Sequence, residues 1–369
     1  MSRARDFADL AGSADAGGIT GKNLIINGAM QVAQRGTSST GVGATGGVFP
    51  CVDRMKIFAG NTAGRATVSQ VADVHDGFAN ALKFECTTAD TSIAADEFFG
   101  VQYLIEGQDV QQLKKGTSDA ESVTLSFYVK GNANATYTVE MFDHDNDRIN
   151  TQTFNVTTSW NRVSLTFVPD TTGALDDDNA KSFQFSIWLH AGSTYTSGTF
   201  ASNTWATRTN GNRVNSSQTS FFDSTSRTFF ITGIQLEVGE QATPFEHRSF
   251  GDELARCQRY FYKVTNASPG GTATRFGQGH ALNGTTAKVI VPTPVTLRTV
   301  PTITTSGTFN VSDASSGTTV TSVGLEAVTS SAETVCLTAN VASGLTAFRP
   351  MFFEGQAGAD ETVSIDAEL

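Results

Sequence analysis

Three aspartates at alternate positions in the stretch DHDND have the residue type and spacing to bind a hard cation. Asp143, Asp145 and Asp147 resemble the first carboxylates of a calcium-binding loop. The downstream glutamate and the turn glycine of an EF-hand are missing from the sequence that follows. The same stretch fits an acidic hairpin turn between two strands, which needs no ion. We therefore predict no cofactor, with calcium at these three aspartates as the alternative.

Several acidic pairs have the residue types that hydrolyse a glycosidic bond. That reaction needs two carboxyl groups about 5–10 Å apart, and the sequence does not fix such a separation. The pairs are Asp96/Glu97, Glu106/Asp109 and Glu140/Asp143. The 5 histidines show no metal-binding or triad spacing, and the sequence has no GxSxG motif or phosphate-binding loop. We predict that the chain is not an enzyme and that its histidines are surface or core residues.

A group of aromatic and basic residues could instead bind a carbohydrate. One tryptophan lies on the polar face of a strand, and the others lie in the segment 191–227, which is rich in Ser, Thr, Asn and Gly. Exposed rings can stack on a sugar face, and arginines can meet an acidic sugar. The candidates are Trp188, Tyr195, Trp205, Arg208 and Arg213. The alternative is that neighbouring segments or chains cover these rings.

Composition and charge exclude other classes of function. The chain of 369 residues has a formal net charge of −11 and no cluster of Lys and Arg, so we predict no nucleic-acid partner. No stretch approaches the ~18 apolar residues of a membrane span, and the N-terminus lacks the apolar core of a signal peptide. We expect no membrane insertion and folding in a cytoplasm. The 4 cysteines are scattered, which favours free, buried thiols.

Alternation of apolar and polar residues predicts that strands position these groups. In VTLSFYVKG (123–131) and FQFSIWLH (183–190), every second residue is apolar. Many such runs, separated by Asn, Asp and Gly turns, are typical of an antiparallel β-sandwich. We predict an all-β chain, with one β-sandwich over residues 22–249 and a smaller one over residues 266–369.

Between the two sandwiches the apolar spacing becomes that of a helix. Four apolar residues recur at intervals of four, three and four, which places them on one helical stripe. They are Phe250, Leu254, Cys257 and Phe261. Ser249 followed by Asp252 resembles a capping box. The sequence predicts a connector helix within residues 250–265.

Taken in order, several stretches resemble tail-fibre-type virion proteins of marine and cyanobacterial phages. The stretches are NLIINGAMQVAQRGTS, CVDRMKIF, QYLIEGQDVQQL, VTLSFYVKGN, SWNRVSLTF and GIQLEVGEQATPFEHRSFGDELARCQRYFY. The resemblance covers nearly the whole chain. It implies that residues 22–249 form a jelly roll similar to carbohydrate-binding modules, followed by a small β-domain.

The resemblance implies a structural, non-enzymatic protein of the phage virion, assembled in the host cytoplasm. A tail fibre that attaches to a host cell-surface glycan is the first expectation, and such a fibre would be a homotrimer. A capsid decoration or head-fibre protein is the second. A tailspike-like polysaccharide depolymerase is the third, and an exposed carboxylate pair in one cleft would favour it.

The chain departs from the related carbohydrate-binding modules at their calcium site. Those modules often carry an acidic residue just after the first-strand Asn-Gly and another on the last strand. Here Ala29 and Met30 follow the Asn-Gly, and the last strand offers Gln235 and Glu237. The departure weakens the expectation of calcium and of inherited sugar binding.

The small-residue arm at residues 1–21 is too short to bury a face of its own. It is either a tail or a peptide that becomes ordered on a partner. We predict that it anchors the chain to other virion proteins, tail or capsid, with Phe7 and Leu10 as apolar contacts.

Overall fold

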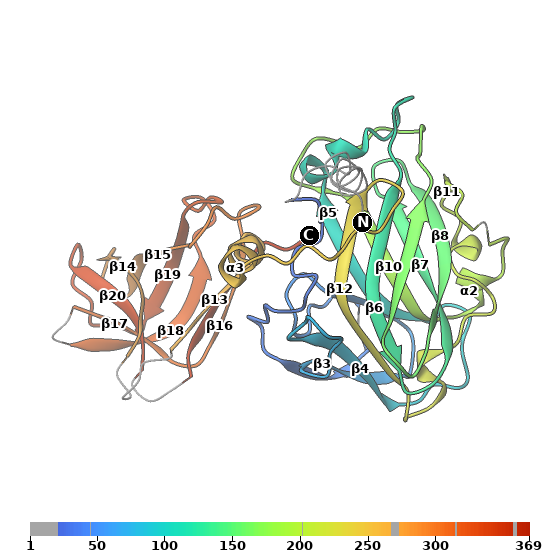
Figure 1. Ribbon diagram of the computed structural model, residues 1–369. Coiled ribbons are helices and arrows are strands. Elements are labelled where there is room, and N and C mark those ends of the chain that lie inside the picture. The colour runs from blue at the N-terminus through green and yellow to red at the C-terminus, as the bar shows by residue number, and fades with distance from the viewer. Residues whose placement is uncertain (1–20, 45, 201, 267–272, 314–315, 357–359) are drawn as a thin grey trace, which may run out of the picture. The chain divides into compact units, whose positions relative to one another are not determined.

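The computed structural model describes residues 21–44, 46–200, 202–266, 273–313, 316–356 and 360–369. The chain divides into two compact units (Figure 1). The first runs to Glu253 and includes Leu369, and the second comprises Leu254–Glu368. Phe7 and Leu10, the predicted anchors of the arm, lie outside the described residues, so their role stays a prediction.

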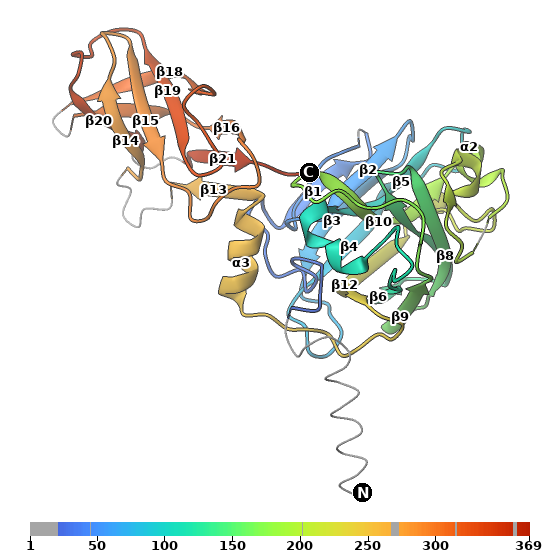
Figure 2. The same cartoon turned by 90° about the horizontal axis from the view of Figure 1, so that it is seen from above.

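The first unit is a sandwich of two six-stranded antiparallel sheets (Figures 1 and 2). The first sheet has the order β1 (Ser38–Val42), β3 (Arg65–Val71), β4 (Ala81–Thr88), β12 (Thr228–Val238), β6 (Val123–Gly131), β9 (Asn161–Phe167). The second has the order β11 (Ala206–Thr207), β8 (Arg148–Val156), β7 (Ala135–Asp143), β10 (Lys181–Ala191), β5 (Phe98–Glu106), β2 (Lys56–Gly60). The predicted jelly-roll sandwich is confirmed.

Aromatic rings from the facing sheets form the core of this sandwich. Phe84 of β4 contacts Phe99 of β5 at a centroid distance of 6.2 Å, and Phe127 of β6 contacts Phe154 of β8 at 5.1 Å. The predicted inner face of β10 is also confirmed, since its alternate apolar residues are all buried. They are Phe183, Phe185, Ile187 and Leu189. Burying rings of this size is the main source of stability that the sequence pattern provides.

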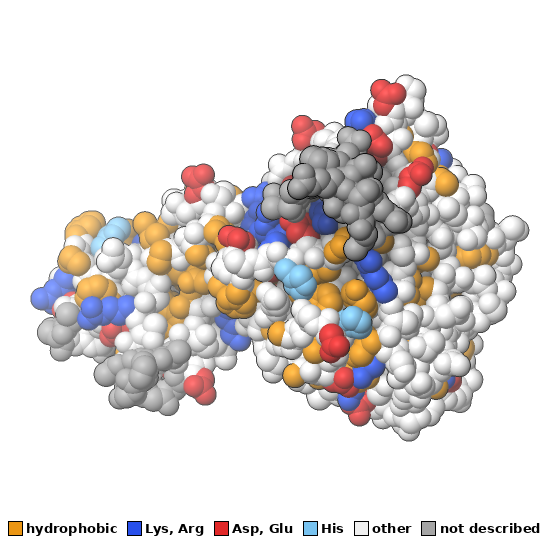
Figure 3. Space-filling view, viewed as in Figure 1, with side chains coloured by type: hydrophobic (Ala, Val, Ile, Leu, Met, Phe, Trp, Pro, Cys, Tyr) orange, Lys and Arg blue, Asp and Glu red, His pale blue; other side chains and the backbone are white. Residues whose placement is uncertain are grey.

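The long connections of the first unit contain short helical turns. They are η1 (Gly107–Asp109), η2 (Gln111–Leu113), α2 (Ser193–Thr196), η3 (Asn210–Asn212) and η4 (Phe221–Asp223). The last three lie in the segment 191–227, which is therefore packed rather than a featureless loop. In the view of Figure 3, uncharged polar side chains and backbone make up most of this unit's surface.

The helix α3 (Phe250–Gln258) begins where the sequence predicts. Ser249 Oγ accepts a hydrogen bond from the backbone N–H of Asp252 at 3.2 Å, as a capping residue should. The predicted end is wrong, because strand β13 (Phe261–Thr265) starts within the expected helix. Aromatic and β-branched residues in FYKVT favour a strand, and pairing with β21 (Thr362–Asp366) satisfies their backbone groups.

The apolar stripe of that helix is only partly buried. Cys257 is buried, but Phe250 is 57% exposed. The buried Glu253 lies on the inner side instead, where its carboxylate accepts a 2.6 Å hydrogen bond from the N–H of Asn27. Tertiary contacts, and not the apolar spacing alone, therefore decide which residues of this helix are buried.

The second unit is also all-β, but six of its strands close into a barrel where two open sheets were expected. The barrel order is β14 (Arg275–Ala281), β15 (Thr286–Val291), β19 (Val335–Val341), β18 (Gly317–Leu325), β17 (Phe309–Ser312), β20 (Pro350–Gly355). A three-stranded sheet adds β13, β21 and β16 (Thr302–Ser306). Among the described residues, no helix is long and apolar enough to cross a membrane.

Candidate functional site

The outer face of the second sheet carries the densest group of predicted site residues. Because side chains alternate along β10, Trp188 points to the opposite side from its buried neighbours Ile187 and Leu189. Its neighbours across the sheet are Thr138 on β7 and Gly100 on β5. The segment 191–227 supplies further residues to the same face.

Trp188 is held by a charged pair. Its indole N–H donates to Glu140 Oε2 at 3.2 Å, and the Arg213 guanidinium lies 4.7 Å from the ring centroid. Arg213 also donates to both oxygens of Glu140, at 2.7 and 2.8 Å. Burial by itself lowers the pKa of Arg213, but the Glu140 carboxylate outweighs it and raises that pKa, so the guanidinium stays charged.

Three further rings enclose Trp188. Phe58 of β2 meets it edge-on at 4.9 Å, Phe98 lies 6.3 Å away and Tyr195 of α2 lies 5.3 Å away. The glycine at position 100 makes this packing possible, since a Cβ there would lie 2.6 Å from the Phe58 ring. As a result Trp188 is only 2% exposed, and the expectation that it is a free stacking surface is wrong.

A polar strip continues the face beyond Trp188. Gln184 donates to Ser186 Oγ at 2.6 Å, and its side-chain oxygen lies 2.9 Å from His144 Nε2. Burial lowers the pKa of His144, so its imidazole is neutral near pH 7. The half-buried Phe142 ring lies 4.2 Å from this imidazole. Gln184 and Ser186 are buried, so a ligand could reach only the half-buried His144 and Phe142 in this strip.

Arg208 brings a second cation to Phe142. Its guanidinium lies 5.4 Å from the ring centroid, and its Nε donates to Asp147 Oδ1 at 2.6 Å. The structure therefore gathers four of the five predicted carbohydrate-binding residues on one face. They are Trp188, Tyr195, Arg208 and Arg213.

Trp205, the fifth predicted residue, is engaged elsewhere. Its indole N–H donates to the Val168 carbonyl at 2.8 Å, and the Lys115 ammonium lies 5.5 Å from its ring. The ring is half-buried, as that of Phe142 is, so its role as a stacking platform stays a prediction. A loop composition rich in small polar residues does not reveal such long-range packing.

The three aspartates of DHDND do not form a cation site in the structure. Asp143 is buried against the Lys115 ammonium at 2.5 Å, and Asp147 is paired with Arg208. Asp145 accepts a hydrogen bond from the N–H of Asp176 at 2.9 Å. The carboxylates already have separate partners, which corrects the alternative of calcium at these residues. The hairpin-turn interpretation is the one the structure supports, since β7 and β8 flank the stretch.

Two groupings in the first unit could not be predicted from the sequence. Glu140 and Phe142 alternate with inward residues of β7, and only their pairing with β10 reveals their role. A buried cluster of Asp90, Glu97 and His190 has ligand atoms within 4.8 Å of one another. Its members are too far apart in sequence to give a recognisable spacing.

A second group of rings lies on the outer face of the first sheet. Tyr128 of β6 contacts His75 at 4.1 Å and Phe78 at 5.5 Å, and Phe78 also contacts Phe245 at 5.1 Å. Residues His75, Phe78, Tyr128 and Phe245 are all half-buried. Because this group lies on the other side of the sandwich, a variant in it can serve as a control for variants on the outer face of the second sheet.

No protein-family profile matches the chain, and no curated protein matches its sequence. Solved structures similar to part of the chain include a family 4 carbohydrate-binding module, with 14% identity and a TM-score of 0.29 over 57% of this chain and 97% of that one. The family 11 carbohydrate-binding module from Clostridium thermocellum has 12% identity and a TM-score of 0.28, over 56% and 99%. The enzymatically active domain of tailspike protein 4 from bacteriophage CBA120 has 10% identity and a TM-score of 0.31, over 58% and 21%.

Proposed function

We propose that the outer face of the second sheet binds a carbohydrate without catalysis, in a structural protein of a phage particle that serves as a tail fibre. The observation that carries the binding proposal is the half-buried Phe142 ring, which has the guanidinium groups of Arg208 and Arg213 at 5.4 and 5.9 Å and the His144 imidazole at 4.2 Å. Sugar rings present CH faces to aromatic rings and hydroxyls to polar side chains. The tail-fibre assignment rests on the sequence resemblance.

Phe142 is the aromatic ring that we propose as the stacking surface of this face. Its ring is half-buried and lies between His144 and the two guanidinium groups of Arg208 and Arg213. The arginine charges suit an acidic sugar, and the half-buried Gln102 side chain can hydrogen-bond sugar hydroxyls, with the buried Gln184 beside it. We expect weak binding per site, of about micromolar to millimolar Kd, strengthened by several copies on one particle.

The partners of the carboxylates support a binding role over hydrolysis. Of the acidic pairs considered from sequence, Glu140/Asp143 has both carboxylates in ion pairs, with Arg213 and Lys115, and Glu97 of the pair Asp96/Glu97 faces His190. A glycosidase needs one carboxyl group free to donate a proton and a second free to attack or activate water. The alternative is a tailspike-like depolymerase, and a measurement of polysaccharide hydrolysis tests it.

The test of binding compares two phenylalanines on opposite faces. The full chain and the variants Phe142→Ala and Phe78→Ala are applied to an array of bacterial surface polysaccharides, and positive binding is quantified by calorimetry. We expect Phe142→Ala to weaken binding at least tenfold and Phe78→Ala to leave it unchanged. Circular dichroism melts establish that both variants are folded.

The reverse pattern, with only Phe78→Ala impaired, would place the site on the first sheet and overturn the assignment. If the chain releases reducing ends from a bound polysaccharide, it is a depolymerase, and the proposal of binding without catalysis is wrong. A wild-type chain that binds no acidic or neutral glycan on the array would remove the carbohydrate proposal altogether.

The position on the particle needs its own experiment. Deleting residues 2–18 should leave a folded chain that no longer joins the virion, since we propose that the arm is the anchor. Labelled antibodies on intact particles distinguish a tail fibre from a capsid decoration or head-fibre protein.

Light scattering of the isolated chain tests the proposed homotrimer, and a monomer at micromolar concentration would contradict it.

A further inference from the structure

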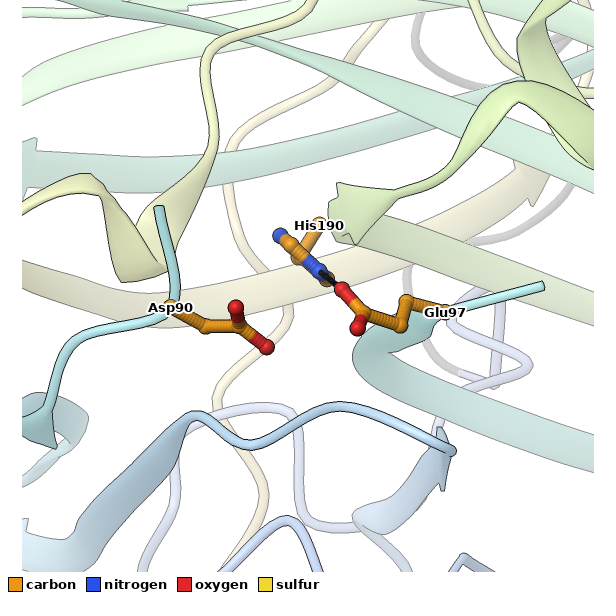
Figure 4. Close-up of side chains that lie close together, drawn as sticks. All are labelled: Asp90, Glu97 and His190. Carbon is orange, nitrogen blue, oxygen red and sulfur yellow. Dashed lines mark hydrogen bonds and ion pairs between the residues drawn. The ribbon is translucent and has the colours of Figure 1, made fainter. Parts of the chain in front are cut away.

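Two carboxylates and one imidazole converge inside the first unit, away from the second-sheet face (Figure 4). Asp90 follows β4, Glu97 immediately precedes β5, and His190 lies near the end of β10. All three side chains are buried, and their ligand atoms lie within 4.8 Å of one another. Figure 4 shows the two carboxyl groups pointing toward the region beside the imidazole.

The cluster is short of positive charge. Among the described residues, neither Asp90 nor Glu97 has an ion pair with a lysine or an arginine. Asp90 Oδ2 accepts from Thr62 Oγ1 and from the N–H of Ala63, both at 2.8 Å. These neutral donors supply hydrogen bonds but no charge. Two buried carboxylates without a compensating cation are expensive to maintain.

Several other buried carboxylates in this unit are neutralised by a lysine or an arginine, although the buried Glu237 accepts hydrogen bonds, within the described part of the chain, only from Gln235 and Thr243. Asp143 has Lys115 at 2.5 Å, and Glu140 has Arg213 at 2.7 Å. Asp170 has Arg148 at 2.7 Å, and Lys115 lies 3.0 Å away. The cluster of Asp90, Glu97 and His190 departs from this pattern, because its one basic group is an imidazole.

The surroundings of His190 suit a metal ligand. Its Nδ1 lies 2.8 Å from Ser220 Oγ, so Nδ1 can donate to the hydroxyl and leave the lone pair of Nε2 facing Glu97. That nitrogen is 3.2 Å from Glu97 Oε2. Two ligand atoms, each about 2.0 Å from a tetrahedral zinc ion, are about 3.3 Å apart, so this spacing already fits a shared cation.

The loops that carry the cluster are fixed by backbone hydrogen bonds. The N–H of Asp90 donates to the Phe222 carbonyl at 2.8 Å, and the N–H of Gly192 donates to the Glu97 carbonyl at 2.8 Å. The N–H of Thr194 donates to the Ala95 carbonyl at 2.8 Å. The side chains are therefore held in place by the fold before any ion binds.

We propose that Asp90, Glu97 and His190 bind one divalent transition-metal cation, with zinc as the best match to one nitrogen and two carboxylate oxygens. A water molecule would complete four-coordination. The ion joins the β4–β5 connection to the end of β10 and thereby fixes the start of the segment 191–227. That segment carries Tyr195, which encloses Trp188, so the metal would also stiffen one wall of the second-sheet face.

The experiment uses the full chain, stripped with EDTA and desalted. We expect ZnCl2 to bind with a stoichiometry of one per chain in calorimetry and to raise Tm by several degrees. The variants Glu97→Gln and His190→Gln should lose both effects. The control His280→Gln removes a histidine from the second unit and should retain them.

Cobalt allows the site to be tested in the wild-type chain, so the result holds even if the variants fold poorly. Co2+ added to the wild-type chain should give the visible absorption of a four-coordinate nitrogen and oxygen site, and zinc should abolish it. A thiolate charge-transfer band would assign the metal to cysteine and overturn the proposal. Absence of zinc binding by the wild-type chain, or a full Tm rise in a folded Glu97→Gln variant, would also overturn it.

Discussion

Arg213 and Glu140 are joined by two parallel hydrogen bonds of 2.7 and 2.8 Å, from a loop to the middle of a strand. Glu140 is fully buried, and the guanidinium also covers the Trp188 ring. This pair fixes the long segment 191–227 to the outer face of the second sheet. A bidentate arginine–carboxylate contact is directional, so it sets the position of the segment as well as its charge balance.

Removing one partner of this pair should destabilise the first unit strongly. Arg213→Met leaves Glu140 buried without a cation, and we expect a loss of about 3–5 kcal/mol in the free energy of unfolding. The double variant Arg213→Met/Glu140→Met should recover part of that loss. Urea unfolding measures both, with Arg208→Met as the control. Arg208 and Asp147 are solvent-exposed, so that variant should cost less than about 1 kcal/mol.

Trp205→Ala should lower stability and leave carbohydrate binding unchanged. The substitution removes the hydrogen bond to the Val168 carbonyl and the ring beside the Lys115 ammonium. We expect a loss of about 1–3 kcal/mol on unfolding, in the usual range for a partly buried side chain. A folded Trp205→Ala protein with impaired glycan binding would show that this ring belongs to the site after all.

Acid should weaken the network around Asp170. Burial by itself raises the pKa of Asp170, but hydrogen bonds from Arg148 and Lys115 outweigh it and hold that pKa below its usual value. The unfolded chain therefore takes up this proton at a higher pH than the folded chain does. The stability contribution is complete above the unfolded pKa of about 3.9 and is lost as pH falls through the folded pKa.

The variant Asp170→Asn isolates that contribution. It should be less stable than wild type at pH 7, because Arg148 loses its carboxylate partner at 2.7 Å. Its unfolding free energy should also change less steeply with pH below about pH 4. Urea unfolding at several pH values measures both properties, and equal slopes for the two proteins would contradict the assignment.

The thiols should differ in their reactivity. Burial raises the pKa of Cys51 to about 11 and that of Cys86 to about 11, while Cys336 is half-buried. Only a thiolate attacks a disulfide reagent, so the buried thiols should stay unmodified in the folded chain at pH 8. We expect Ellman's reagent to modify Cys336 first and the others only on unfolding. Early labelling of Cys51 would show that the β-sandwich opens readily.

The sequence by itself determined the local elements of this protein. Alternation in the strands placed Phe183, Phe185 and Ile187 in the core, because neighbouring side chains on a strand point to opposite faces. The capping pair Ser249 and Asp252 located the start of the connector helix for a similarly local reason. These features depend on residues a few positions apart, so a single sequence contains them.

Only the tertiary structure decided which side chains meet. The pairing of β7 with β10 brings Glu140 beside Trp188, and a loop contact then adds Arg213. Alternation specifies a face but not the neighbouring strand, which depends on the free energy of packing the whole sandwich. The pairing of His190 with Glu97 also required distant strands to adjoin. Burial also decided what these residues do, because polar side chains that could have been exposed are enclosed in hydrogen-bonded clusters.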